Sequence, residues 1–119
     1  MATYSRVLLS GCSNGEPVKI AAIATAGTTI HTAVTGTTSF DELYLWVTNT
    51  DTSARTLTIE FGGVTDPDNL VVKALSIPAN SPPIPVVAGL VLNNAQVVGA
   101  FASSANVLLL TGYVNRITP

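Results

Sequence analysis

Residues 11–15, Gly-Cys-Ser-Asn-Gly, match the G-x-S-x-G pattern in which serine hydrolases expose a nucleophile on a strained turn between a strand and a helix. A proline and a predicted strand follow Ser13 in this 119-residue chain, so the helix that the pattern needs is missing. We therefore interpret the segment as a β-turn in which Asn14 and Gly15 adopt positive φ angles.

The single histidine, His31, has no acidic residue beside it in the sequence. It could act as a base only if the fold brought Asp41 or Asp51 to it. One histidine and one cysteine, Cys12, are too few ligands for a zinc site, and a lone cysteine excludes a disulfide within the chain.

Asp66, Asp68 and Asn69 could supply oxygen ligands to Ca²⁺. Pro67 between the two acids favours an ordinary turn held by side-chain hydrogen bonds instead. The sequence therefore predicts a protein that is not an enzyme and that has no metal site and no cofactor.

Charge is scarce in the chain. Charged residues make up 10% of it, against about 25% in an ordinary soluble domain, and residues 74–115 carry none. The five Lys and Arg residues stand singly in a chain of net charge −2, which argues against nucleic acid as a partner. Frequent Pro, Asn and Gly argue against a membrane span. The start of the chain lacks the layout of a signal peptide, so we expect synthesis in a cytoplasm. The uncharged stretch indicates a surface that other protein covers.

Periodicity predicts an all-β chain. Strands are expected at residues 6–10, 18–25, 28–34, 40–49, 56–63, 71–77, 86–92, 96–102 and 107–116. Eight or nine such strands predict a single domain over residues 1–119, a two-sheet β-sandwich of jelly-roll or Greek-key topology. Residues 1–5 are expected to form an N-terminal arm and residues 117–119 a tail, and four prolines in segment 78–85 predict a crossover.

The strand expected at 40–49 alternates aliphatic with aromatic residues. Its aliphatic residues are expected to face the core, which puts Tyr44 and Trp46 on the opposite face. These aromatics could pack beneath a loop, anchor a protein interface or stack against a sugar. The polar turn at 49–55 and the renewed alternation at 56–63 predict a hairpin.

Three stretches resemble the small β-sandwich virion proteins of tailed bacteriophages, especially the capsid decoration (cement) proteins. They are LYLWVTNTDTSARTLTIEFGG, SIPANSPPIP and GLVLNNAQVVGAFASSANVLLLTGYV, within residues 43–114. The similar features are a TNTD-like polar turn, a proline-bearing crossover, and an ASSAN-like turn before a last strand ending in Gly-Tyr-Val. The resemblance implies a structural protein of the capsid surface without catalytic residues. It would bind the major capsid protein as a symmetric oligomer, a homotrimer, and stabilise contacts between coat subunits.

In such an oligomer the uncharged 86–114 region is expected to face sister copies. Aspartate at Leu109 or Val98 is then expected to give monomers. Two other interpretations stay open: a tail or neck connector or fibre-base protein, and a carbohydrate- or receptor-binding β-sandwich module. The residues expected at the interface are Tyr44, Trp46, Val98, Phe101, Leu109 and Tyr113.

Overall fold

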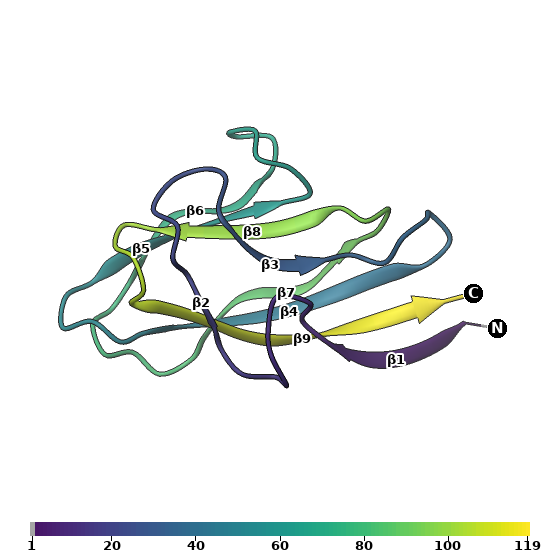
Figure 1. Cartoon of the computed structure of the whole chain (residues 1–119), viewed down its shortest axis with the longest axis horizontal. Helices are drawn as coiled ribbons and strands as arrows, with labels where there is room; N and C mark the ends of the chain where they lie inside the picture. Colours follow the sequence, from purple (N-terminus) through teal and green to yellow (C-terminus); the bar gives the residue numbers. More distant parts are fainter. Residues whose placement is uncertain (1) are drawn as a thin grey trace.

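The computed structural model describes residues 2–119, and the described chain is all-β. Its nine strands form two antiparallel sheets, which lie one above the other in Figure 1. The expected fold class, a two-sheet β-sandwich, is confirmed. The strands are β1 (Thr3–Leu8), β2 (Val18–Lys19), β3 (Thr28–Thr32), β4 (Phe40–Asn49), β5 (Arg55–Phe61), β6 (Leu70–Ile77), β7 (Ile84–Leu92), β8 (Val97–Ala102) and β9 (Leu108–Thr118).

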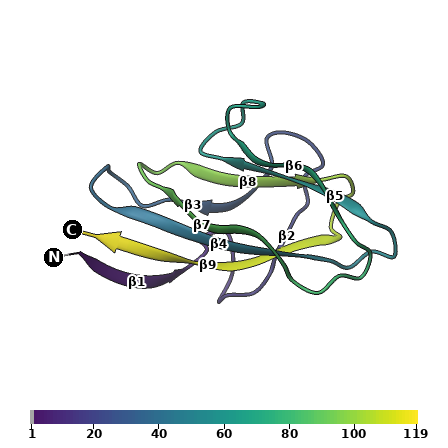
Figure 2. The same cartoon turned by 180° about the vertical axis from the view of Figure 1, so that it is seen from behind.

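The strand order is that of a jelly roll. One sheet runs β1-β9-β4-β7, with the short β2 also paired to β9, and the other runs β3-β8-β5-β6. Apart from β2, the strands pair from the two ends of the chain inward: β1 with β9, β3 with β8, β4 with β7, and β5 with β6. Successive pairs belong alternately to the two sheets, as in a jelly roll. The two chain ends consequently lie side by side, as Figures 1 and 2 show from opposite sides.

Each sheet contributes aliphatic side chains to one core. Leu43, Leu45 and Val47 of β4 are fully buried, and so are Leu57 and Ile59 of the facing strand β5. The chain exposes 6025 Å², close to the roughly 6,100 Å² that surface scaling gives for a compact monomer of 12.2 kDa. One chain therefore completes its own core.

The predicted hairpin between β4 and β5 is wrong, because these strands belong to different sheets. Segment 50–54 carries the chain across the sandwich, and β5 pairs with β6 and β8 instead. Alternation shows which side chains of a strand face the core. Two strands that face each other across the core have the same alternation as two strands that pair within one sheet, so the pattern does not identify the pairing partner. The proline-rich segment 78–83 then returns the chain from β6 to β7 of the other sheet.

The ends of the chain differ from the expected arm and tail. Residues 3–5 and 117–118 lie within β1 and β9, which pair from Thr3 with Thr118 to Leu8 with Tyr113. Met1 lies outside the described residues. The strand expected at 18–25, by contrast, is limited to β2, because the hydroxyl oxygen of Thr28 accepts hydrogen bonds from the backbone N–H groups of residues 21 and 22.

The position of β8 and β9 accounts for much of the missing charge. Each is a central strand, β8 between β3 and β5 and β9 between β1 and β4. Val98 of β8 is fully buried in the core, so it contacts the facing sheet and cannot contact a partner from this position. The prediction that Val98 lies at an interface is therefore wrong, and Val98 is a core residue.

Substitution of Val98 by Asp should therefore unfold the protein rather than give folded monomers. An unpaired charge in the core costs several kcal/mol, about the whole stability of a small domain. Val97→Asp is the matched control, because Val97 is 41% exposed and lies next along the same strand. Circular dichroism with urea unfolding should show a folded V97D variant and an unfolded V98D variant. A folded V98D variant would contradict this core assignment.

Candidate functional site

The fold brings Asp41 to His31, as a histidine base would require. His31 Nε2 lies 2.7 Å from Asp41 Oδ2, while Arg116 binds the same carboxylate through Nε at 2.8 Å and a terminal nitrogen at 3.0 Å. The backbone N–H of Val34 adds a further hydrogen bond to Oδ2 at 3.1 Å. Asp41 thus joins β3 of one sheet to β4 and β9 of the other.

The His31–Asp41 pair of this cluster is closed off from solvent. His31 is 1% exposed and Asp41 is 0% exposed. His31 Nδ1 accepts a hydrogen bond from the backbone N–H of Ser10 at 3.0 Å, which leaves Nε2 to carry the ring hydrogen that points to Asp41. Both ring nitrogens are occupied, so the histidine connects the two sheets and has no free nitrogen to act as a base.

The charge balance of Asp41 favours its ionised form. Burial alone would raise the pKa of this carboxyl. The hydrogen bonds and positive charge of Arg116, with the hydrogen bond from His31, outweigh burial and hold the pKa of Asp41 below its ordinary value. The carboxylate in turn raises the pKa of Arg116.

Residues 11–15 form a turn, as predicted. Asn14 and Gly15 have φ angles of 54° and 83°, and the backbone N–H of Glu16 donates to the Ser13 carbonyl at 2.9 Å. Ser13 is exposed on this loop between β1 and β2. The histidine hydrogen-bonds to the backbone of Ser10 instead of to Ser13.

Residues 65–69 also form a turn held by their own side chains. Asn69 Oδ1 accepts from the backbone N–H of Thr65 at 3.1 Å, and Asp66 pairs with Lys73 at 3.1 Å. Among residues 2–119, no three His, Cys, Asp or Glu side chains gather as a metal site would require. The described chain also has no helix that is long and apolar enough to cross a bilayer.

The outer surface of the five-stranded sheet carries most of the exposed aromatic residues, and we call it the aromatic face. Alternate residues of β1, β4, β7 and β9 point away from the core there, by the cross-strand register. Charged side chains on it are few. Its members are Tyr4, Arg6, Leu8, Lys19, Phe40, Glu42, Tyr44, Trp46, Thr48, Pro85, Ala88, Val91, Leu109, Thr111, Tyr113, Asn115 and Ile117.

Three aromatic rings form the centre of this face. Tyr44 and Tyr113 are directly opposite on β4 and β9, with ring centroids 5.0 Å apart, and Trp46 stacks on Tyr113 at 6.0 Å. The guanidinium of Arg6 lies 4.5 Å from the Tyr113 ring centre. The Tyr44 hydroxyl donates to Glu42 at 2.9 Å, which raises the pKa of Tyr44.

Four of the six residues expected at an interface lie together on the aromatic face: Tyr44, Trp46, Leu109 and Tyr113. Phe101 pairs with Thr58 on β5 and belongs to the other sheet. Since Tyr44 and Trp46 are half-buried beside Tyr113, they are neither core residues nor isolated rings. Sequence reasoning missed Arg6, whose place over Tyr113 depends on the pairing of β1 with β9.

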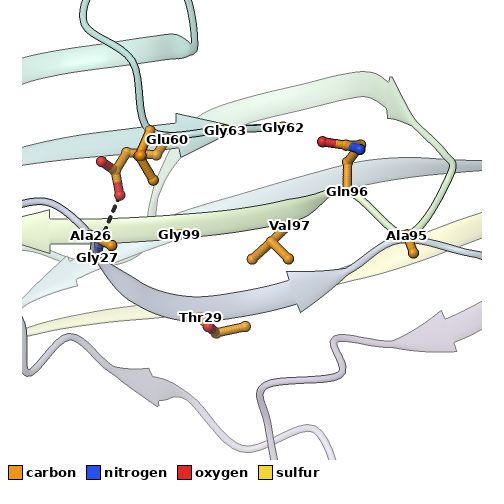
Figure 3. Close-up of a pocket in the computed structure, with 11 residues that line it drawn as sticks. Ala26, Gly27, Thr29, Glu60, Gly62, Gly63, Ala95, Gln96, Val97 and Gly99 are labelled. Atoms are coloured by element: carbon orange, nitrogen blue, oxygen red, sulfur yellow. Dashed lines mark hydrogen bonds between the residues drawn. The ribbon is translucent and has the colours of Figure 1, made fainter.

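A pocket of about 280 Å³ on the other sheet was also missed. Glu60 of β5, 2% exposed, forms one end of it, and Gln96 stands at the opposite end, with Val97 and Gly99 of β8 between them (Figure 3). Glu60 accepts hydrogen bonds from the Thr25 hydroxyl at 2.5 Å and the Gly27 backbone N–H at 2.7 Å. A glutamate amid the apolar alternation of β5 is the only sequence signal for it.

Comparison with known proteins found no matching family model, no similar curated protein and no similar solved structure.

The Asp41 cluster should make stability fall in acid. Because the pKa of Asp41 is lower in the folded protein than in the unfolded chain, its contribution is complete above the unfolded value of about 3.9 and is lost as the pH falls through the folded value. Urea unfolding at neutral pH and at about pH 3 should show this loss. Asp41→Asn should cost about 3–5 kcal/mol at neutral pH and flatten the acid dependence.

The control for this measurement is Asp51→Asn. The pKa of Asp51 is also lowered, by its hydrogen bond to Arg55, but this pair lies at the surface. Its loss should change stability much less. Equal acid dependence in the D41N variant and the unsubstituted protein would contradict the assignment.

Proposed function

We propose that the protein is a structural component of a phage virion. It binds the outside of the capsid as a symmetric oligomer, a homotrimer by the family resemblance, and stabilises contacts between subunits of the major capsid protein. The aromatic face is its surface for contact with sister copies. The clustering of Tyr44, Trp46, Leu109 and Tyr113 on one exposed sheet face carries this proposal.

The apolar content of the aromatic face supports a protein contact there. Tyr4 is 70% exposed, Leu8 54%, Val91 48% and Phe40 41%, all on this face. Monomeric proteins expose large apolar side chains singly, whereas contiguous exposed patches mark interaction sites. Aromatic residues and Arg are also the residues that interface centres favour.

The charges of the aromatic face favour a second copy of the chain as the occupant. Arg6 lies over Tyr113, and Glu42 accepts hydrogen bonds from Tyr44 and Asn115, so both charges have partners within the chain. Lys19 lies on the two-residue strand β2, opposite Leu109 of β9. Such a face needs no complementary charge from its partner, and two copies meet there without strong repulsion.

Aspartate at Leu109 should convert the oligomer into folded monomers. Leu109 is half-buried on the outer side of β9, so a charge there enters the contact without entering the core. Val71→Asp is the control, because Val71 is 42% exposed on β6 of the other sheet. Light scattering after size exclusion should give monomers for L109D and the unchanged oligomer for V71D. An L109D protein that stays oligomeric would contradict the assigned surface.

The role in a virion is tested by the copy number of the protein relative to the major capsid protein in purified particles. Quantitative mass spectrometry should give a ratio near one copy per coat subunit if the protein covers the shell. A few copies per particle would assign it to the tail or neck instead. Complete absence would reject the virion role and make glycan binding by the three stacked rings the next test.

A further inference from the structure

The pocket beside Glu60 lies on the four-stranded sheet, away from the aromatic face. Ala26 and Gly27, at the end of loop 23–27, form one wall, and residues 62–64 form another. Its floor is open because β8 carries a glycine, Gly99, opposite Glu60. The hollow is therefore built by the backbone and by small residues.

Glu60 is a buried carboxylate without a positive partner. The ion pairs found between residues 2 and 119 involve Asp41, Asp51 and Asp66, and none involves Glu60. Its hydrogen bonds come from a neutral hydroxyl and a neutral backbone N–H. A buried charge normally has a counter-charge, since desolvation costs several kcal/mol that neutral donors repay only in part.

More oxygen atoms point into the same space. A Cβ atom placed on Gly99 would lie 3.5 Å from Glu60 Oε1, 3.5 Å from the Thr28 carbonyl oxygen and 3.6 Å from the Gly27 carbonyl oxygen. All three are hydrogen-bond acceptors. The empty position above Gly99 is thus surrounded by acceptors, which suits a group that donates several hydrogen bonds.

The other residues that line the pocket limit which class of ligand it can bind. Ala26, Val64, Ala95 and Val97 give the pocket apolar walls, and Val97 lies between Glu60 and Gln96 (Figure 3). It contains no aromatic ring to stack a sugar or base and no Lys or Arg to bind an anion. Its volume suits one side chain, because pockets for larger ligands start at about 300 Å³.

We propose that this pocket binds a primary alkylammonium group, with the ammonium at Glu60 and the alkyl chain along Val97 and the small residues of the walls. The group has two possible sources, a lysine side chain of a partner protein and a free diamine. The site is independent of the aromatic face, so it stands or falls separately from the proposed virion role.

The test is titration of the full chain with pentylamine, followed by amide NMR. The signals of Gly27, Gly62 and Gly99 should shift in a saturable way at millimolar concentrations, as expected for so small a ligand. Pentanol at the same concentration and sodium chloride at the same ionic strength should not reproduce the shifts. Non-saturable shifts, or equal shifts with pentanol or salt, would overturn the proposal.

Two variants test the residues. Glu60→Gln keeps the shape and lets the Thr25 hydroxyl turn to accept a hydrogen bond, but it removes the charge, so pentylamine affinity should fall at least about tenfold. Gly99→Ala adds a methyl group with no atom nearer than 3.5 Å and should block the same site without harming the fold. Glu16→Gln on an exposed loop is the control for lost charge.

The melting temperature of the ligand-free protein distinguishes a ligand-binding role of Glu60 from a purely structural one. If Glu60 is an uncompensated charge, the E60Q variant should melt at the same temperature as the unsubstituted protein or higher. A lower melting temperature together with unchanged pentylamine binding would overturn the proposal. Two further ligands distinguish the sources: Nα-acetyl-lysine N-methylamide, which keeps the free side-chain ammonium, and 1,5-diaminopentane. Tighter binding of the lysine derivative indicates a lysine of a partner protein. Tighter binding of 1,5-diaminopentane indicates a free diamine.

Discussion

The buried carboxylate of Asp41 determines how the two sheets meet at one end of the sandwich. It accepts hydrogen bonds from His31 on one sheet, from Arg116 on the other and from the backbone of Val34 in the link between β3 and β4. Dispersion and the hydrophobic effect bring the sheets together but scarcely depend on direction. The stabilisation of a fully buried charge does depend on direction, because any shift of one sheet along the other separates the carboxylate from its hydrogen-bond donors. The jelly-roll register and the place of β3 over β4 and β9 therefore depend on this residue.

Fixing both sheets in this way leaves their outer surfaces free to differ. On the five-stranded sheet, Tyr44 and Trp46 both stack on Tyr113, so the three rings hold one another in place. The four-stranded sheet is partly covered by loop 23–27, which Glu60 holds through Thr25 and Gly27. One surface is preorganised for a broad contact, and the other for a single inserted group. The low charge of the chain thus has two origins, the central position of β8 and β9 and the apolar outer face of the five-stranded sheet.

Much of the local structure could be predicted from the sequence because the side-chain period of a strand is a local property. The alternation over Phe40–Asn49 assigned Leu45 to the core and Trp46 to the outside, and the structure agrees. Strand partners depend on the whole chain, and so the predicted hairpin between β4 and β5 failed although both strands were found. Val98 was misplaced for a related reason: an apolar run such as Val97-Val98 does not show which residue faces inward until pairing is known.

The polar sites could not be predicted because their members meet only in the fold. Asp41 lies 75 residues from Arg116 in the chain, and Glu60 lies 35 residues from Thr25. The sequence did indicate that His31 needed an acidic partner, with Asp41 and Asp51 as the two candidates, but it could not show that burial would turn the pair of His31 and Asp41 into a connection between sheets. The same geometry distinguishes the two acids. Asp41 is matched by a guanidinium and has no further partner to seek, whereas Glu60 is held by neutral donors beside an open hollow. An acid that the fold leaves unneutralised at a cavity is the better guide to binding than one that the fold has already paired.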